Sequence, residues 1–261
     1  TIRDVEIRVP KLFIGNKSDV ISQKIIEIER RAKMLIWKLS NGNYILFHLK
    51  MTGQMLYAEE LGTRNSGLEK LVPSIQSLVP PHVVAGGGHP DKVYLQKPPH
   101  QYTHVIFTLD KGHLYLNDLR RFGWVKVVDK DGLKIAVAKY GPEIDWPEFT
   151  FDYFVKALNR KLKTKIKTVL MLQNLIAGIG NIYSDEILFK AKVLPTRPIN
   201  DLSEGELRAI YDSIKPVLEM AIKHGGTSLK DYRRLDGSQG DYLHYANVYH
   251  RTGQPCKICK T

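Results

Sequence analysis

The chain has 261 residues, 43% of them apolar, which is enough to build one large hydrophobic core or two of ordinary size. Lysine and arginine number 39 against 27 acidic residues, so the formal net charge is +12. This excess favours a polyanionic partner, nucleic acid first, through phosphate neutralisation and counterion release. No stretch approaches the roughly 18 apolar residues of a membrane span, and Thr1 to Asp4 does not open a signal peptide. These features predict a soluble, intracellular protein without a membrane partner.

The first half of the chain carries short, alternating apolar patterns that predict β-strands. These patterns lie at Val5–Val9, Met34–Leu39, Tyr44–Leu49, Tyr102–Leu109, His113–Leu116 and Trp124–Val128. Asn41-Gly42 separates two of them and suits the positive φ angles of a tight hairpin turn. Residues 59–101 are polar, rich in glycine and proline and without periodicity, which predicts an inserted loop. We therefore expect an antiparallel β-sandwich or barrel over residues 1–128.

After Val128 the apolar spacing becomes helical. It predicts helices at Tyr153–Leu158, Ile166–Leu175, Ile182–Ala191 and Glu204–Lys223. Ser203 and Glu206 form an S-x-x-E capping box at the start of the last one. Residues 129–149 contain Pro142 and Pro147 and predict an interdomain linker. The predicted fold class is therefore α+β, with the sandwich or barrel first and a helical domain second.

A window from Tyr153 to Ser184 has no acidic residue but several basic ones. These are Lys156, Arg160, Lys161, Lys163, Lys165 and Lys167. The window ends in I-A-G-I-G-N-I-Y, where Gly178 and Gly180 allow a tight turn between helices and leave backbone N–H groups open at a helix start. An ordinary helical corner with a solvated lysine face is the alternative. The absence of acidic residues favours a phosphate-binding surface.

Two further patterns in the first half suggest chemistry on DNA. Arg120 and Phe122 belong to N-D-L-R-R-F-G at a strand end, where an aromatic wedge can fill the gap left by an extruded base and an arginine can pair with the orphaned partner. A core phenylalanine beside a surface arginine is the plainer reading. Lys33, in R-R-A-K, has an amine suited to Schiff-base chemistry if neighbouring cations lower its pKa. A solvated strand charge is the alternative.

The only cysteines, Cys256 and Cys259, form a C-x-x-C pair near the end of the chain. Two such residues do not make a disulfide framework, and the pair supplies half of the four ligands of a structural zinc site. A redox-active pair is the alternative, but no thioredoxin-like βαβ pattern surrounds it. His244 and His250 lie nearby, although their spacing does not require a metal.

Taken in order, a series of strings resembles the formamidopyrimidine-DNA glycosylase family over nearly the whole chain. They are R-R-A-K, H-L-K-M-T-G, T-H-V, N-D-L-R-R-F-G, G-P-E, I-A-G-I-G-N-I-Y-S-D-E-I-L-F, G-G-T-S-L-K-D-Y and Y-H-R-T-G-Q-P-C-K-I-C. The resemblance implies a monomeric base-excision repair enzyme of the bacterial cytoplasm and nucleoid, which grips double-stranded DNA between two domains. An amine attacks C1′ of a flipped nucleotide carrying 8-oxoguanine or a formamidopyrimidine, expels the base and cleaves the strand by elimination.

The resemblance also implies domains and site residues. A helix-two-turn-helix domain covers residues 150–240, with a lesion-capping loop at 227–240, and the first half of a zinc finger covers 241–261. Lys33 matches the family's assisting lysine, and Met51, Arg120 and Phe122 match the trio that fills the vacated stack and meets the orphaned cytosine. Gly180 and Asn181 match the phosphate-binding helix start, with Lys167 as a nearby basic contact.

Three positions depart from the family's pattern or extend it. Tyr102 falls where the family often has a phosphate-binding histidine. Leu162 lies near another expected basic contact, for which Lys161 or Lys163 would substitute. Lys230, in the expected capping loop, is a further candidate DNA contact.

The two ends of the chain depart most. The family's nucleophile is an N-terminal proline followed by a glutamate acid at the head of a short helix, whereas residue 1 here is threonine, and the second cysteine pair would lie beyond Thr261. We expect a fragment of a longer, zinc-containing enzyme that binds damaged duplex DNA but excises little by itself. The alternatives are a non-catalytic sensor of damaged DNA and an endonuclease VIII-type glycosylase for oxidised pyrimidines, although the latter generally lacks the Arg-Phe arrangement.

Overall fold

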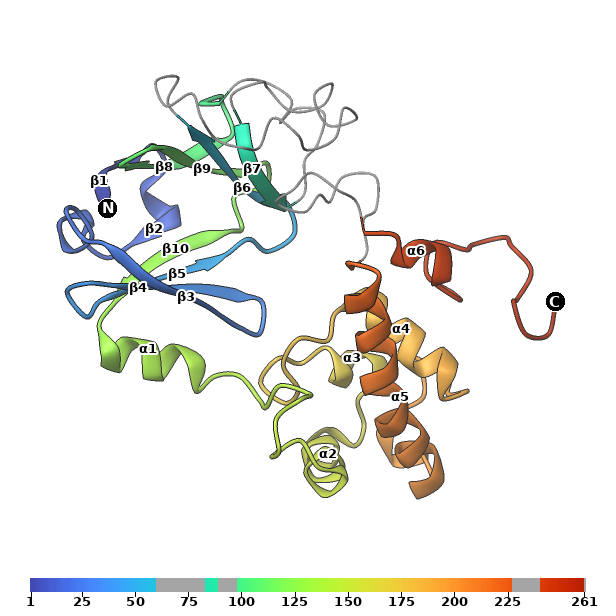
Figure 1. The fold of residues 1–261 in the computed structure, drawn as a ribbon. Coiled ribbons are helices and arrows are strands. Elements are labelled where there is room, and N and C mark those ends of the chain that lie inside the picture. The colour runs from blue at the N-terminus through green and yellow to red at the C-terminus, as the bar shows by residue number, and fades with distance from the viewer. Residues whose placement is uncertain (60–82, 89–97, 227–239, 261) are drawn as a thin grey trace. The chain divides into compact units, whose positions relative to one another are not determined.

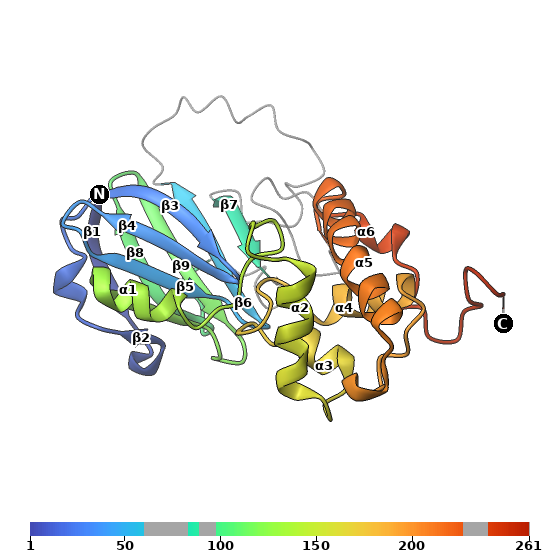
Figure 2. The same cartoon turned by 90° about the horizontal axis from the view of Figure 1, so that it is seen from below.

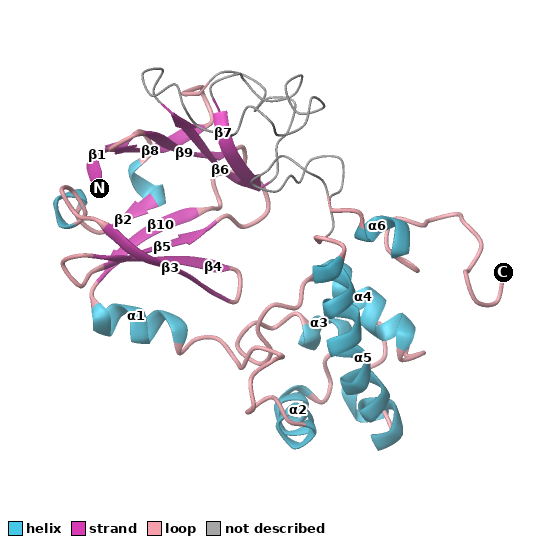
Figure 3. Cartoon of the chain, in the orientation of Figure 1, coloured by secondary structure: helices cyan, strands magenta, loops and turns pink. Residues whose placement is uncertain are grey.

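The computed structural model describes residues 1–59, 83–88, 98–226 and 240–260, and the chain divides into two compact units. Among the described residues, the first unit contains residues 1–136 and Gly240, and the second contains residues 137–226 and 241–260. The strands of the described segments belong to the first unit, whereas the second is helical (Figure 3). This confirms the α+β fold class expected from the change in apolar periodicity.

The first unit is a sandwich of two five-stranded sheets. One sheet has the order β1 (Ile2–Ile7), β8 (Thr103–Leu109), β9 (Gly112–Asp118), β6 (Gly53–Glu59) and β7 (Val83–Gly88). The other has the order β2 (Phe13–Ile14), β10 (Trp124–Val128), β5 (Tyr44–His48), β4 (Met34–Leu39) and β3 (Ile25–Arg31). Neighbouring strands are antiparallel except for the short pair of β2 with β10 (Figure 1). Short 3-10 turns, η1 (Pro10–Leu12) and η2 (Lys17–Asp19), flank β2.

The two sheets lie one over the other (Figure 2). A buried apolar cluster with side chains from both sheets holds them together. At its centre Phe107 of one sheet meets Trp37 and Phe47 of the other, with ring centroids 6.0 and 5.8 Å apart. Each of these rings is at most 5% exposed. Tilted and edge-on contacts of this kind add to the free energy gained by burying apolar area.

Four strands were not anticipated from the sequence, and the shortest of them is the two-residue β2. β3 has a largely exposed middle and therefore lacks the inside–outside contrast on which the prediction relied. β6 begins at Gly53, in a segment after Leu49 for which the sequence analysis predicted no strand. β7 lies inside the segment predicted as an inserted loop, where it pairs with β6. The predicted Asn41-Gly42 turn joins β4 to β5, with positive φ only at Gly42.

The second unit is built on α2 (Phe151–Leu158), α3 (Ile166–Leu170), α4 (Asn181–Lys190), α5 (Glu204–Lys223) and α6 (Tyr242–Tyr245). The 3-10 turns η5 (Asn159–Lys161) and η6 (Ile199–Asp201) connect them. A core of fully buried aliphatic side chains joins α2 to α5, including Leu158, Ile176 and Ile210. α5 covers the residues predicted for it, and the predicted capping box is present with both of its hydrogen bonds.

Two predicted elements differ from the structure. The helix expected over Ile166–Leu175 ends at Leu170, because the next ten residues form a turn described below. The expected linker contains helix α1 (Lys130–Val137), whose first turn is closed by the Asp129 carboxylate accepting from the Gly132 N–H at 2.7 Å. α1 buries none of its residues, and the sequence analysis assigned its segment to the linker. None of the described helices combines the length and apolar character needed to cross a membrane.

Candidate functional site

Met51 meets Arg120 and Phe122, which lie about seventy residues later in the sequence, on an exposed tip at one end of the sandwich. The Arg120 guanidinium lies over the Phe122 ring, 4.8 Å from its centroid, and Arg120 Nη1 lies 3.6 Å from Met51 Sδ. Met51 is 61% exposed and Phe122 52% exposed, so neither belongs to the core. The plainer interpretation of Phe122 as a core residue is therefore wrong. The tip exposes two apolar side chains, and the Arg120 guanidinium contacts both of them.

A single buried carboxylate, that of Asp118 at the end of β9, shapes this tip. Asp118 Oδ1 accepts from Thr52 Oγ1 at 2.5 Å and from Arg120 N at 3.1 Å, while Oδ2 accepts from Gly123 N at 2.6 Å. The carboxylate thus links the β5–β6 turn to the β9–β10 turn. The sequence analysis included Asp118 in the motif N-D-L-R-R-F-G but assigned it no role, because its hydrogen-bond partners lie on two separate segments.

Two residues of the tip adopt left-handed backbone conformations that non-glycine residues rarely populate. Lys50 has φ +54° and Arg121 has φ +56°. Next to Lys50, a Cβ on Gly53 would stand 2.3 Å from the Leu49 carbonyl oxygen, so the turn closes only with glycine there. This turn directs Met51 outward while His48 remains in the sheet.

Lys33 lies at the same end of the sandwich, in the turn that joins β3 to β4. In the β4–β5 ladder Leu35 pairs with Phe47, so the segment just before β4 runs beside the turn that follows β5. Loss of surrounding water and the charge of Lys50 lower the pKa of Lys33. The same two causes, with Lys33 adding its charge, lower the pKa of His48 to about 4. His48 is therefore a neutral imidazole at neutral pH, and its Nδ1 accepts from Lys50 N at 3.0 Å.

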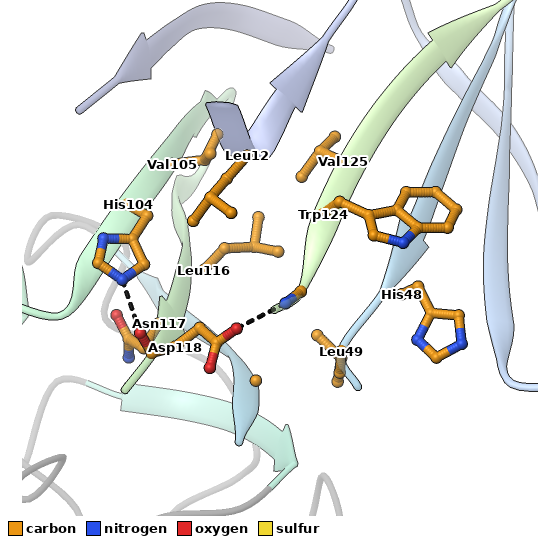
Figure 4. Close-up of a pocket in the computed structure, with 12 residues that line it drawn as sticks. Leu12, His48, Leu49, His104, Val105, Leu116, Asn117, Asp118, Trp124 and Val125 are labelled. Atoms are coloured by element: carbon orange, nitrogen blue, oxygen red, sulfur yellow. Dashed lines mark hydrogen bonds between the residues drawn. The ribbon is translucent and has the colours of Figure 1, made fainter. Parts of the chain in front are cut away.

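A cavity opens between the two sheets at this end (Figure 4). It is small, with a volume of about 20 Å³, and its wall is mainly apolar. Its polar lining includes His48, His104, Asn117 and Asp118 (Figure 4). His104 Nε2 lies 2.7 Å from the Asp118 carbonyl oxygen, and burial lowers the pKa of His104. The cavity therefore has a mainly apolar lining and places the neutral imidazole of His48 beside the tip.

Tyr102 is half-buried directly before β8, with its ring 6.1 Å from that of His100. Its carbonyl accepts from Asp118 N at 3.0 Å. The backbone of Tyr102 therefore belongs to the framework of the tip.

In the second unit, residues 171–180 form the turn that precedes α4, and the Gln173 side chain organises it. Gln173 Nε2 donates to the carbonyls of Met171 and Ile179, at 3.0 and 2.7 Å, and its Oε1 accepts from Gly178 N at 3.0 Å. Gly178 has φ +93°, which supports the sequence argument that glycine is needed there. The segment that enters this unit also packs closely, since a Cβ on Gly141 would meet the Leu175 carbonyl oxygen at 2.2 Å.

α4 begins at Asn181 with Gly180 as its N-cap, and no side chain caps it. Its first turn contains no acidic residue, and Asn181 is exposed. Such a helix start carries partial positive charge and favours an anion. Lys161 and Lys163 are exposed on the segment before α3. Lys167 differs, because its ammonium is paired with Asp185 of α4 at 2.8 Å.

Sequence reasoning missed Glu186, the buried carboxylate of α4, which is 1% exposed. Its Oε2 accepts from the backbone and side-chain nitrogens of Asn247, at 2.8 and 3.0 Å, and its Oε1 accepts from Val248 N and Tyr249 N, at 2.9 and 3.0 Å. One carboxylate thus fixes the segment that follows α6 onto α4. The sequence signal for this role was the Asp185-Glu186 pair that follows the glycine turn. The hydrogen-bond partners of Glu186 lie about sixty residues away, so the sequence did not reveal them.

Cys256 is half-buried and Cys259 exposed, and the two cysteines form no disulfide. The neighbouring Lys257 ammonium donates to the Ala246 carbonyl at 2.5 Å. Within the described part of the chain, no group of three or more histidine, cysteine or acidic side chains is arranged to hold a metal. Lys230 and nearly all of the expected capping loop at 227–240 lie outside the described residues.

Comparison with known proteins gives a consistent result. The model of the formamidopyrimidine-DNA glycosylase N-terminal domain matches residues 1–125, and that of the formamidopyrimidine-DNA glycosylase H2TH domain matches residues 140–233. A formamidopyrimidine-DNA glycosylase of Herpetosiphon aurantiacus is 36% identical over 259 residues, covering 98% of this chain and 80% of the relative. One of Listeria innocua is 33% identical over 268 residues, covering 100% and 85%.

Solved structures agree with the sequence comparison. The Lactococcus lactis Fpg in complex with abasic-site DNA matches with a TM-score of 0.78 and 27% identity, covering 100% of this chain and 84% of that one. The MutM (Fpg) protein of Thermus thermophilus matches with a TM-score of 0.77 and 30% identity, with the same coverage. On the agreement of both domain models, the curated relatives and the folds, the chain belongs to the formamidopyrimidine-DNA glycosylase family.

Proposed function

We propose that this protein is a base-excision repair DNA glycosylase with abasic-site lyase activity that removes oxidised purines from duplex DNA. Its relatives carry the name of that enzyme, and one structural neighbour, from Lactococcus lactis, is complexed with DNA containing a Fapy-dG lesion. The observation that carries the proposal for this chain is the exposed contact of Met51, Arg120 and Phe122. Two exposed apolar side chains on two linked turns do not pack into the core. A duplex with one base extruded offers an apolar gap between stacked bases into which such side chains can insert.

Each part of the tip has a role in this proposal. Phe122 and Met51 occupy the vacated stack, and Arg120 donates to the hydrogen-bonding edge of the orphaned base. Asp118 keeps both turns in place, so insertion of the tip does not require the turns to reorganise first. Lys33 and the neutral His48 face the extruded sugar from the same end of the sandwich.

Phosphate binding is assigned to the helical unit. The uncapped start of α4 at Gly180 and Asn181 offers backbone donors, and Lys161 and Lys163 supply exposed cations. Lys167 contributes less, because Asp185 already compensates its charge. Tyr102 and Lys230 remain proposed DNA contacts. With DNA as its substrate, we place the protein at the nucleoid as a monomer.

Zinc has no part in the proposed chemistry. A structural zinc ion needs four ligands, and the described residues supply two thiols, Cys256 and Cys259, with no third ligand arranged beside them. The residues present therefore do not fit the ion by themselves, and no step depends on it.

The test compares duplexes that differ only at one nucleotide. Excision of 8-oxoguanine and of a formamidopyrimidine is measured with the protein expressed from its own gene, against an undamaged duplex and one carrying an oxidised pyrimidine. We expect release of the oxidised purines. Binding of the 261-residue chain to the same duplexes is measured in parallel at several salt concentrations, and we expect it to weaken as salt rises. Salt-independent binding, or preferential release of the oxidised pyrimidine, would contradict the proposal.

A further inference from the structure

We propose that Lys50 is a further DNA-binding residue of the tip, whose ammonium binds a backbone phosphate beside the gap that Met51 enters. This inference rests on the proposed function, since it requires the tip to insert into a duplex with one nucleotide extruded. Lys50 is exposed, and its ammonium forms no ion pair with any residue that the structure describes. The inference assigns a ligand, the phosphate group, to this side chain.

The backbone of Lys50 is held in a conformation that disfavours a side chain. Its φ of +54° lies in the left-handed region, where Cβ crowds the following carbonyl oxygen. The turn is nevertheless fixed, because Lys50 N donates to His48 Nδ1 at 3.0 Å and Gly53 N donates to the Leu49 carbonyl at 2.9 Å. Glycine would adopt this conformation without strain, so the turn itself does not require a lysine. Strained residues of this kind cluster at functional sites, which points to a role for the side chain.

The surroundings of Lys50 are cationic, so an anion is the ligand that fits them. The two segments that form the tip, residues 48–53 and 119–124, contain one lysine and two arginines and no acidic residue. The Asp118 carboxylate is only 5% exposed and already accepts three hydrogen bonds from the two turns. Loss of surrounding water and the charge of Lys50 lower the pKa of Lys33, so the two ammonium groups repel each other. A phosphate bound beside them relieves this repulsion.

The place of Lys50 in the chain decides which phosphates it reaches. It directly precedes Met51, and its ammonium stands on a flexible four-carbon stem. A side chain inserted into the base stack lies between the two sugar-phosphate strands, with the phosphates of the adjacent nucleotides around it. Lys50 therefore meets a phosphate next to the vacated step. Such a contact adds affinity and fixes the position of the tip, but it reads no base.

Three variants separate the charge of Lys50 from the strain of its backbone. Lys50→Gln removes the charge and keeps the strain, Lys50→Gly removes both, and Lys50→Arg keeps both. Binding of the 261-residue chain to a duplex with a tetrahydrofuran abasic analogue is measured at several salt concentrations. We expect Lys50→Gln and Lys50→Gly to weaken binding by about fivefold to tenfold at about 0.1 M salt and to lower the salt slope by about one, because one phosphate contact is lost. Lys50→Arg should stay within about twofold of the parent.

Lys111→Gln is the matched control, because Lys111 is an exposed lysine of the same unit far from the tip. It lies in the turn where Leu109 pairs with Gly112, whereas the tip lies at the other end of β8 and β9, where Thr103 pairs with Asn117. At ~3.4 Å per residue the strands separate the two ends by about 20 Å. Lys111→Gln should change the affinity by less than about twofold.

Thermal unfolding distinguishes the side chain from the shape of the turn. Lys50→Gly should raise the melting temperature by about 2–4 °C, because glycine relieves the strain at this position. Lys50→Gln should melt within about 2 °C of the parent, so that its weaker binding does not reflect lost folding. A glycine variant that is more stable but binds DNA less tightly supports the inference. If Lys50→Gly binds as tightly as the parent, the lysine side chain contributes nothing and the inference is wrong.

The contacted phosphate is located with duplexes in which one phosphate at a time, close to the abasic analogue on either strand, is replaced by an uncharged methylphosphonate. One such replacement should weaken binding by the parent but not by Lys50→Gln, in which the charge pair is already broken. If no single replacement behaves in this way, or if Lys50→Gln matches the parent in affinity and salt slope, the inference is wrong while the proposed function stands. If the parent itself does not bind the duplex, or binds it independently of salt, both fail.

Discussion

The Glu186 carboxylate offers the sharpest test of how the helical unit is assembled. It is almost fully buried and accepts four hydrogen bonds from Asn247, Val248 and Tyr249. Glu186→Gln keeps the shape of the side chain but replaces one oxygen with an amide that donates. If that amide faces Asn247, the Asn247 side chain can turn its own carbonyl toward it, but the Asn247 backbone N–H is left without an acceptor.

The expected cost follows from these contacts. A buried N–H group without a partner costs roughly 1–3 kcal/mol, and the remaining hydrogen bonds lose the added strength that a charged acceptor gives. We therefore expect Glu186→Gln to lower the free energy of unfolding of the second unit by about 2–4 kcal/mol. Urea denaturation measures the total, and amide hydrogen exchange at Val248 and Tyr249 shows whether the loss is local.

Glu148→Gln is the matched control, because Glu148 is an exposed carboxylate in the same unit. Its effect on stability should stay within about 0.5 kcal/mol. Measuring the DNA affinity of both variants tests the role of Glu186 independently of stability. Either substitution adds one to the formal net charge of +12, so electrostatics alone predicts tighter binding. Weaker binding by Glu186→Gln alone would show that the segment after α6 must be held in place. A destabilisation no larger than that of the control would refute this account of Glu186.

Three further predictions concern the tip, the basic surface and acid stability. Phe122→Ala should reduce affinity for a duplex with an extruded base by about 1–3 kcal/mol while leaving the melting temperature nearly unchanged, and equal loss on undamaged duplex would contradict insertion. Lys163→Ala should lower the salt slope of duplex binding by about one, and Lys167→Ala by less because of Asp185; equal slopes would argue against that difference. The pKa of Glu206 is lowered to about 2, mainly by its hydrogen bond to Arg197, so its stabilising effect is present above its unfolded pKa of about 4.5 and is lost as pH falls through about 2. The difference in melting temperature between Glu206→Gln and the parent should therefore shrink between pH 5 and about pH 2, and a constant difference would refute the assignment.

The prediction of elements succeeded where one face of an element is buried and failed where it is not. β4 and β10 bury alternate or near-alternate residues, and their bounds agree with the sequence patterns. α5 agrees as well, because an apolar stripe and a capping box both mark it. β3 is mostly exposed and leaves no hydrophobic period in the sequence, whereas α1 buries nothing and its short segment was assigned to the linker. The end of α3 depended on Gln173, whose side-chain bonds compete with further helix.

In the candidate site, too, the sequence predicted residues with local signals but not contacts between distant segments. Family strings in the sequence pointed to Met51, Arg120 and Phe122, and residue types pointed to Lys33 and the glycine turn. They could not show that Asp118 joins two turns, that His48 is neutral, or that Asp185 compensates Lys167. Each of these depends on a partner that is distant in sequence or on the local loss of water.

The sequence by itself determined the α+β class, the basic character, the glycine corner before α4 and the strings that mark the family. These follow from periodicity, composition and backbone conformations that only some residues adopt, all of which are local properties of the chain. The tertiary structure alone decided which charges are paired and which remain exposed, and how two turns combine into one tip. Hydrogen bonds and pKa values depend on distances between atoms of separate segments, and those distances exist only after the chain has folded.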